Sequence, residues 1–387
     1  MTVQEWDVIV IGGGIAGVSI AYELAADTTV CLLETESTLA YHSTGRSAAA
    51  FIESYGNLPI RALTVASRGV FTDPPDIFES AVSRPLPLLY VAGEGRAGAI
   101  RSLQDQVREL TPDIEVLDAA EAERRHPLLR PGHVELALWE PGALDLDVHA
   151  LHQGYAKGLR GRGGHVATSA RVVEAVRARG RWTLTDGSGR QFRAPVVVNA
   201  AGAWCDAVAA VLGVEPIGIQ PLRRTVFMVP APAVDPDRPV PLTIDVDDRF
   251  YFKPETDMLL CSPADETPQA PGDAKPDTLD IAMALDAIND ATTIDARHVR
   301  HSWAGLRSFT ADRTPVVGYD PAADGVFWFA GQGGYGIQAG PALARTGAAL
   351  LRRGPVPADV AERGLRAEML APGRPSLSVS EGTVHQR

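Results

Sequence analysis

The stretch Trp6-Asp-Val-Ile-Val-Ile-Gly-Gly-Gly-Ile-Ala-Gly17 decides the fold of this 387-residue chain. Its β-branched run predicts a buried parallel strand, and the glycines predict a tight turn into a helix over 15–26. A second apolar run over 29–33 predicts the next strand, which Glu34 closes. This order is that of a βαβ unit, and it predicts a doubly wound α/β sheet.

The glycine spacing in this unit matches G-x-G-x-x-G and predicts a dinucleotide site. Gly12 allows the tight turn, Gly14 lets the backbone approach a pyrophosphate, and Gly17 lets helix and strand pack closely. The helix N-terminus offers N–H groups to the phosphates, and Glu34 can accept hydrogen bonds from ribose hydroxyls. A glycine turn without a ligand is the alternative, which the joint register of strand, helix and acid disfavours. The predicted contacts are Gly12, Gly14, Ile15, Ala16, Gly17, Glu34 and Thr35.

Three later segments favour FAD over NAD as the dinucleotide. The loop Tyr41-His-Ser-Thr-Gly-Arg-Ser-Ala48 can wrap a pyrophosphate and an isoalloxazine edge with hydroxyls, N–H groups and the charge of Arg46. A predicted strand within 195–204 ends in small residues, where backbone can pass close to a cofactor. The glycine-rich segment 331–338 precedes a predicted helix over 341–352, whose dipole can face a ring carbonyl. Together the segments predict a discontinuous domain around one long cofactor.

Seven segments in a fixed order carry a family resemblance. They are GGGIAG (12–17), Glu34, YHSTGRSA (41–48), NAAGAW (199–204), WAGLRSF (303–309), ADRTPVVG (311–318) and GQGGYGIQ (331–338). Over nearly its whole length the chain resembles the D-amino acid oxidase/glycine oxidase superfamily of FAD-dependent oxidoreductases. Within that superfamily it is most similar to the bacterial D-arginine dehydrogenase group. The resemblance implies an FAD domain interleaved with a substrate domain built on a mixed, largely antiparallel sheet.

The same resemblance implies domain bounds and cofactor contacts. The expected FAD domain comprises 1–84, 146–217 and 307–372, the substrate domain 85–145 and 218–306, and a flexible tail 373–387. The further expected FAD contacts are Ser43, Thr44, Arg46, Ser47, Ala48, Val172, Val173, Ala201, Gly202, Trp204, Gly305, Arg307, Gly333, Gly334, Tyr335, Gly336, Ile337 and Gln338.

The resemblance also implies a reaction and its residues. Hydride passes from the carbon next to a neutral amine to flavin N5, and the imine product hydrolyses. Arg307 and Arg224 match arginines that hold the substrate carboxylate, although Arg223 is an equally good solvated residue by sequence alone. Tyr55 and Tyr251 match tyrosines that cover the substrate, and for Tyr251 a core aromatic is the open alternative.

One departure from the D-arginine dehydrogenase pattern concerns the substrate side chain. Leu88, in the stretch 86–89, stands where that group has a glutamate for the guanidinium, and Ala50 stands where it has a histidine. An arginine substrate would therefore leave a buried cation unpaired. We predict an apolar pocket that includes Ala50, Leu88 and Gln332, suited to an uncharged D-amino acid or an N-substituted glycine.

Composition excludes several classes of protein. A formal net charge of −12 argues against nucleic acid and anionic membrane partners. The three cysteines are widely spaced and favour neither disulfides nor zinc. Sarcosine oxidase-like relatives attach FAD through a cysteine near the segment that corresponds to Ser308, and none of the three cysteines lies there, so the resemblance implies noncovalent FAD. We predict no metal site, no membrane span and a cytoplasmic location; the histidines at 149 and 152 are expected to be ordinary.

Two hypotheses of function remain from the sequence. The first is a flavin amine oxidoreductase that acts alone on a small amino acid, with O₂ or a quinone or dye as electron acceptor. The second is a flavin-bound subunit of an electron-transfer or multi-enzyme assembly. The predicted carboxylate clamp favours the first, and the sequence does not fix the oligomeric state or the acceptor.

Overall fold

A computed structural model describes residues 4–235 and 237–378. The glycine turn follows the carboxyl end of an interior strand in a six-stranded sheet. The sheet order is β10-β3-β2-β14-β22-β21, and every pairing is parallel except that of β21 with β22. All four residues of β2 are buried, as expected for a strand covered on both faces. The strands are β2 (Val8–Ile11), β3 (Val30–Leu33), β10 (His165–Ala167), β14 (Val196–Asn199), β21 (Val316–Tyr319) and β22 (Val326–Ala330).

Two layers cover this sheet, and alternate residues of β2 point into them. Val8 and Val10 pack with α1, α5 and α8, whereas Ile9 and Ile11 pack with α6 and a four-stranded sheet. This alternation follows from the two-residue period of a strand. The helices are α1 (Ile15–Leu24), α2 (Leu58–Thr72), α5 (Val148–Gly161), α6 (Cys205–Leu212), α8 (Gly340–Leu351) and α9 (Ala358–Ala361). The four-stranded sheet contains β1 (Gln4–Glu5), β11 (Val172–Ala178), β12 (Arg181–Asp186) and β13 (Gln191–Ala194).

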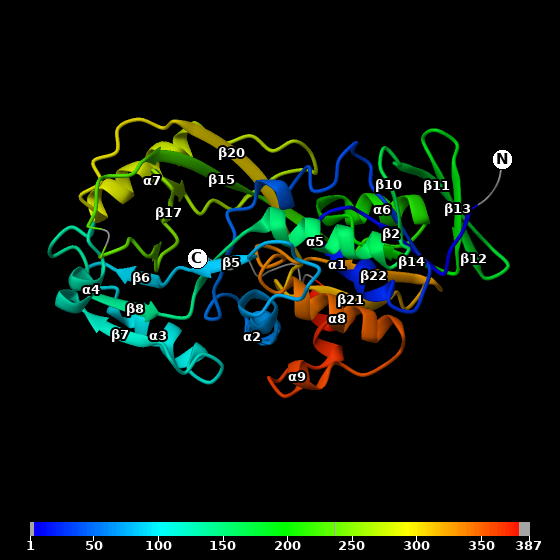
Figure 1. Cartoon of the computed structure of the whole chain (residues 1–387), viewed down its shortest axis with the longest axis horizontal. Helices are drawn as coiled ribbons and strands as arrows, with labels where there is room; N and C mark the ends of the chain where they lie inside the picture. The colour runs from blue at the N-terminus through cyan, green and yellow to red at the C-terminus, as the bar shows by residue number, and fades with distance from the viewer. Residues whose placement is uncertain (1–3, 236, 379–387) are drawn as a thin grey trace.

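A second large sheet of nine strands forms the other half of the molecule (Figure 1). Helix α7 lies near β15 and β20, and helices α3 and α4 lie near β7 and β8. Its order is β19-β15-β18-β17-β16-β6-β8-β7, with β20 paired to β15, and only β6–β16 is parallel. Its strands are β6 (Leu88–Ala92), β7 (Glu115–Asp118), β8 (Leu136–Glu140), β15 (Gln220–Pro230), β16 (Leu242–Asp245), β17 (Tyr251–Glu255), β18 (Met258–Ser262), β19 (Thr267–Pro268) and β20 (His301–Phe309). The accompanying helices are α3 (Ala97–Val107), α4 (Ala119–Arg125) and α7 (Thr278–Ala291).

A small three-stranded sheet also lies in the chain, with β4 (Ala50–Phe51) and β5 (Ser83–Pro85) on either side of β9 (Leu144–Leu146). The two large sheets draw their strands from interleaved parts of the sequence. The mixed α/β architecture with a parallel sheet and a largely antiparallel second sheet confirms the predicted fold class. Within residues 4–235 and 237–378, no helix is long and apolar enough to cross a membrane.

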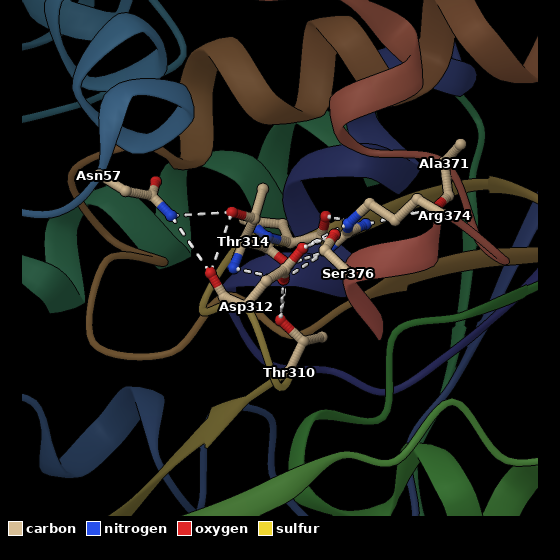
Figure 2. A network of polar contacts seen from close by, with 8 residues as sticks. Asn57, Thr310, Asp312, Thr314, Ala371, Arg374 and Ser376 are labelled. Atoms are coloured by element: carbon tan, nitrogen blue, oxygen red, sulfur yellow. Dashed lines mark hydrogen bonds and ion pairs between the residues drawn. The ribbon is translucent and has the colours of Figure 1, made fainter. Parts of the chain in front are cut away.

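Residues 373–378, the start of the predicted tail, pack against the body of the protein. Arg374 is buried and donates two hydrogen bonds to the carboxylate of Asp312, at 2.7 and 2.8 Å. Ser376 donates to the same carboxylate, and Asn57 and Thr314 extend the network (Figure 2). The polar composition predicted a loose segment, yet Arg374 and Asp312 form an ion pair there and the other side chains hydrogen-bond around it. Residues 379–387 of the predicted tail lie outside the described residues.

Candidate active site

Four loops meet at the carboxyl edge of the parallel strands. They follow β2, β3, β14 and β22, and they are residues 12–14, 34–36, 200–204 and 331–338. Carboxyl ends of parallel strands share one edge, where ligands bind in open α/β sheets. These loops line a cavity of about 810 Å³ that extends to the second sheet.

The glycine turn leaves no room for side chains at two positions. Gly12 has φ +112°, and a Cβ there would lie 2.4 Å from the carbonyl oxygen of Ala200. A Cβ at Gly17 would lie 1.7 Å from the carbonyl oxygen of Gly12. Gly17 therefore acts behind the cavity wall, where it lets α1 start directly beneath the turn.

Three side chains brace this turn. Glu34 accepts a hydrogen bond from the Gly13 N–H at 2.6 Å, and Thr44 Oγ1 accepts one from the Ile15 N–H at 3.0 Å. His152 Nε2 donates to the Gly13 carbonyl oxygen at 2.9 Å. Burial lowers the pKa of His152, so the ring is neutral near pH 7 with its proton on Nε2. Sequence reasoning missed His152, because its contact joins α5 to a turn 139 residues away.

The loop 41–48 is fastened to β20. Ser43 Oγ donates to the Leu306 carbonyl at 2.6 Å, and the Trp303 indole donates to the Arg46 carbonyl at 3.0 Å. The guanidinium of Arg46 bonds the Ala304 carbonyl at 3.2 Å and the carboxylate of Asp273 at 2.5 Å. Arg46 lines the cavity, and its guanidinium pairs with the carboxylate of Asp273, which also lines it.

The register of two long strands brings two predicted arginines together. In the antiparallel pair of β15 and β20, Arg224 lies opposite Gly305 and Leu222 lies opposite Arg307. Directly paired residues share a face, so the two guanidinium groups are diagonal neighbours beside the cavity. Arg223 faces the other way and pairs with Asp265 at 2.9 Å. Strand alternation thus places Arg224, and not Arg223, beside the cavity.

Tyr55 and a carboxylate contact the two arginines. Arg307 Nη1 donates to the Tyr55 hydroxyl at 3.2 Å, and burial raises the pKa of that phenol, so it is protonated. Glu266 Oε1 lies 2.6 Å from Arg307 Nη2 and 3.4 Å from Arg224 Nη2. The Nε atoms of both arginines are buried without a hydrogen-bond partner among the residues that the structure describes.

Tyr251 faces the cavity. Phe250 and Phe252 are fully buried in the core of the second sheet, so strand alternation turns Tyr251 to the opposite side. Its ring lies 5.9 Å from the Arg224 guanidinium carbon, and burial raises the pKa of its hydroxyl. Lys253, two residues on, also lines the cavity and pairs with the buried carboxylate of Asp145.

Most residues that the sequence singled out line this one cavity. They are Gly12, Gly14, Ile15, Ala16, Glu34, Thr35, Ser43, Thr44, Arg46, Ser47, Ala48, Ala50, Tyr55, Val172, Ala201, Gly202, Trp204, Arg224, Tyr251, Gly305, Arg307, Gln332, Gly333, Gly334, Gly336, Ile337 and Gln338.

Four residues that the sequence singled out do not line the cavity: Gly17, described above, and Leu88, Val173 and Tyr335. Leu88 is fully buried in the core beside β16 and does not line the cavity; Leu242, its register partner, does. The sequence could not show this, because residues of two neighbouring strands, β6 and β16, are candidates for the same part of the cavity wall. Val173 is 51% exposed on an edge strand and lies outside the cavity lining. Tyr335 is buried behind the lining and packs against Tyr55, with ring centroids 5.0 Å apart.

A parallel sheet with a glycine turn at its carboxyl edge, and a second sheet that closes the same cavity, define a two-sheet nucleotide-cofactor protein. The chain belongs to the FAD-dependent oxidoreductase (DAO) family, whose model matches residues 7–350. This confirms the predicted family and FAD as the cofactor. The tight turn at Gly12 fits such a group at this cavity. So does the Nε2 of Gln332, which is buried without a hydrogen-bond partner among the residues that the structure describes.

Individual relatives are similar to this chain at low sequence identity. Glycine oxidase of Geobacillus kaustophilus is 24% identical, over 95% of this chain and 96% of that protein. A crystal structure of glycine oxidase from the same organism has a TM-score of 0.80 and 22% identity, covering 91% of this chain and 95% of that one. Mouse mitochondrial dimethylglycine dehydrogenase is 26% identical over 67% of this chain, but the match spans only 31% of its length.

Proposed function

We propose that this protein oxidises the C–N bond of a small amino acid, a D-amino acid or an N-substituted glycine with an uncharged, apolar group. The observation that carries the proposal is the pair Arg224 and Arg307, on one face beside the FAD cavity with partnerless Nε atoms. Two planar guanidinium groups suit a carboxylate, which they can hold with paired hydrogen bonds.

In this proposal the chain's own groups position the substrate. Arg307 and Arg224 bind its carboxylate, and the protonated Tyr55 hydroxyl, 3.2 Å from Arg307, donates a further hydrogen bond to it. Tyr251 covers the substrate and excludes water from that side. The chemistry that FAD would supply when bound is acceptance of a hydride from the carbon next to nitrogen, and the imine product would hydrolyse after release. Positioning of that carbon supplies most of the rate enhancement that the protein provides.

The walls near Ala50 support the choice of an apolar substrate group. Ala50, Ile52, Leu242 and Ile244 line this part of the cavity. Lys253 lies near this part of the cavity and forms an ion pair with Asp145. Asp145 lies opposite Ala50 in the antiparallel pair of β9 and β4. Lys253 is already paired and Asp248 also lines the cavity, so the choice against D-arginine rests on the apolar residues around Ala50, among which a guanidinium would be buried.

Substrate profiling tests the proposal. The purified FAD protein is assayed with D-Leu, D-Phe, sarcosine, N-ethylglycine and D-Arg against an artificial electron acceptor. We expect turnover of at least one uncharged compound and little turnover of D-Arg; a clear preference for D-Arg overturns the substrate assignment.

A pair of variants tests the carboxylate clamp in the same assay. Arg224→Met removes one guanidinium from the cavity, whereas Arg223→Met removes its neighbour on the opposite face of β15. We expect kcat/KM to fall about 100-fold in the first variant, equivalent to about 3 kcal/mol for lost charged hydrogen bonds. Activity per folded molecule is unchanged in the second. Equal losses in both variants contradict the assigned role of Arg224.

A further inference from the structure

The carboxylate of Glu266 occupies the centre of an arginine cluster. Glu266 lies in the loop between β18 and β19. Its Oε1 is 2.6 Å from Arg307 Nη2, 2.7 Å from Arg313 Nη2 and 3.4 Å from Arg224 Nη2. Its Oε2 accepts a hydrogen bond from Arg313 Nη1 at 3.0 Å.

These contacts create a competition within the proposed clamp. Glu266 Oε1 takes donors from both arginines that the proposed function assigns to the substrate carboxylate. Three guanidinium groups face this one carboxylate, which leaves two formal positive charges among the four side chains. The cluster thus attracts a second anion, and an anion that binds the Nη2 atoms of Arg307 and Arg224 takes over the donors that Oε1 now uses.

Arg313 gives Glu266 a second place to bind. It already contacts both carboxylate oxygens, and its guanidinium carbon lies 3.9 Å from the ring centroid of Phe309. The turn that carries Arg313 is fixed by the neighbouring Asp312, which Arg374 and Ser376 hold from the C-terminal segment (Figure 2). Arg313 is therefore a well-anchored partner that Glu266 can retain without Arg307.

We propose that Glu266 is an internal competitor for the substrate carboxylate. In the substrate-free protein it binds Arg307 and Arg224; when substrate arrives it releases them and keeps its two-oxygen pair with Arg313. Glu266 thereby weakens carboxylate binding and keeps the two arginines neutralised between turnovers. This inference rests on the proposed function, because it needs the substrate carboxylate to bind Arg307 and Arg224.

Calorimetric titration of the FAD-loaded protein with sodium propionate tests this role without turnover. We expect Glu266→Gln to lower the propionate Kd about tenfold. Glu266→Asp keeps the charge near Arg313 but has a shorter reach, and we expect about a threefold decrease. Arg313→Gln removes the second partner, and the propionate Kd should rise several-fold. Asp280→Asn is the matched control, because it removes a carboxylate from Arg223 on the other face of β15 and should leave the Kd unchanged.

The double variant Glu266→Gln/Arg313→Gln separates competition from bracing. If Glu266 competes, the double variant binds propionate like Glu266→Gln, since Arg313 then has no carboxylate to hold. If Glu266 only braces Arg307, both Glu266 variants bind propionate more weakly, which overturns the inference. Arg307→Met tests the clamp itself: unchanged propionate affinity there contradicts the proposed function. Weakened affinity in Arg307→Met without tightening in the Glu266 variants overturns the competitor role alone.

Discussion

Replacing Gly17 by alanine should detach FAD from the protein. The added Cβ would lie 1.7 Å from the Gly12 carbonyl oxygen, whereas ordinary contact begins at 3.4 Å, so helix α1 and the turn must separate by the difference, 1.7 Å. Both partners are backbone, and neither can rotate away. Overpacking of this kind costs about 1–3 kcal/mol, and a backbone contact places it near the upper limit. Because the displaced turn faces the cavity, we expect about a 100-fold loss of FAD affinity.

The assay measures flavin bound per chain after purification and the FAD Kd by fluorescence titration of the apoprotein. Gly69→Ala is the matched control: Gly69 is exposed within α2, and a Cβ there meets no atom within 4 Å among the described residues. This variant should keep its FAD and gain about 0.5–1 kcal/mol of stability, because alanine favours the helix. Wild-type FAD affinity in Gly17→Ala would refute the reasoning about the turn.

Three further predictions concern buried polar groups. Burial raises the pKa of Glu140 from 4.5 to about 7. Because the folded protein then resists ionisation of this carboxyl, the unfolding free energy should fall by up to about 3 kcal/mol as the pH rises through that range. The difference in melting temperature between pH 5 and pH 8 should be smaller in Glu140→Gln than in wild type. Arg374→Met leaves Asp312 without its paired donors, and denaturant unfolding should show a loss of about 3 kcal/mol; an unchanged value would mean that the C-terminal segment contributes no stability. His152→Leu removes the donor to the Gly13 carbonyl, which costs about 1–3 kcal/mol, and the purified variant should retain less FAD than wild type, whereas full flavin content would contradict the bracing role.

The parallel sheet and its glycine turn were predictable because their signals are local. The apolar run before Gly12, the spacing to Gly17 and the acid at Glu34 each follow from contacts between near neighbours in sequence. Tyr251 could be placed in part by strand alternation, since Phe250 and Phe252 must face the core.

The missed features depend on contacts between distant segments. Glu266 and Arg313 belong to different loops, and only the folded sheet brings their side chains within 3.0 Å. Leu88 was predicted to line the pocket from its match to the D-arginine dehydrogenase pattern. In the structure its register partner on β16, Leu242, lines the cavity instead. Arg374 lies in a polar segment whose ion pair with Asp312 spans 62 residues, and composition carries no signal of it.

Anaerobic mixing of the purified yellow protein with amino acids tests the central claim most directly. The flavin absorbance band near 450 nm is followed in wild type and in Arg307→Met, with D-Leu, D-Phe and N-alkylglycines as separate additions. If the protein is an amino acid oxidoreductase that acts alone, at least one uncharged compound bleaches the wild-type band without any other protein, and Arg307→Met bleaches far more slowly. A wild-type flavin that no amino acid in the series reduces, although dithionite does, would contradict the account.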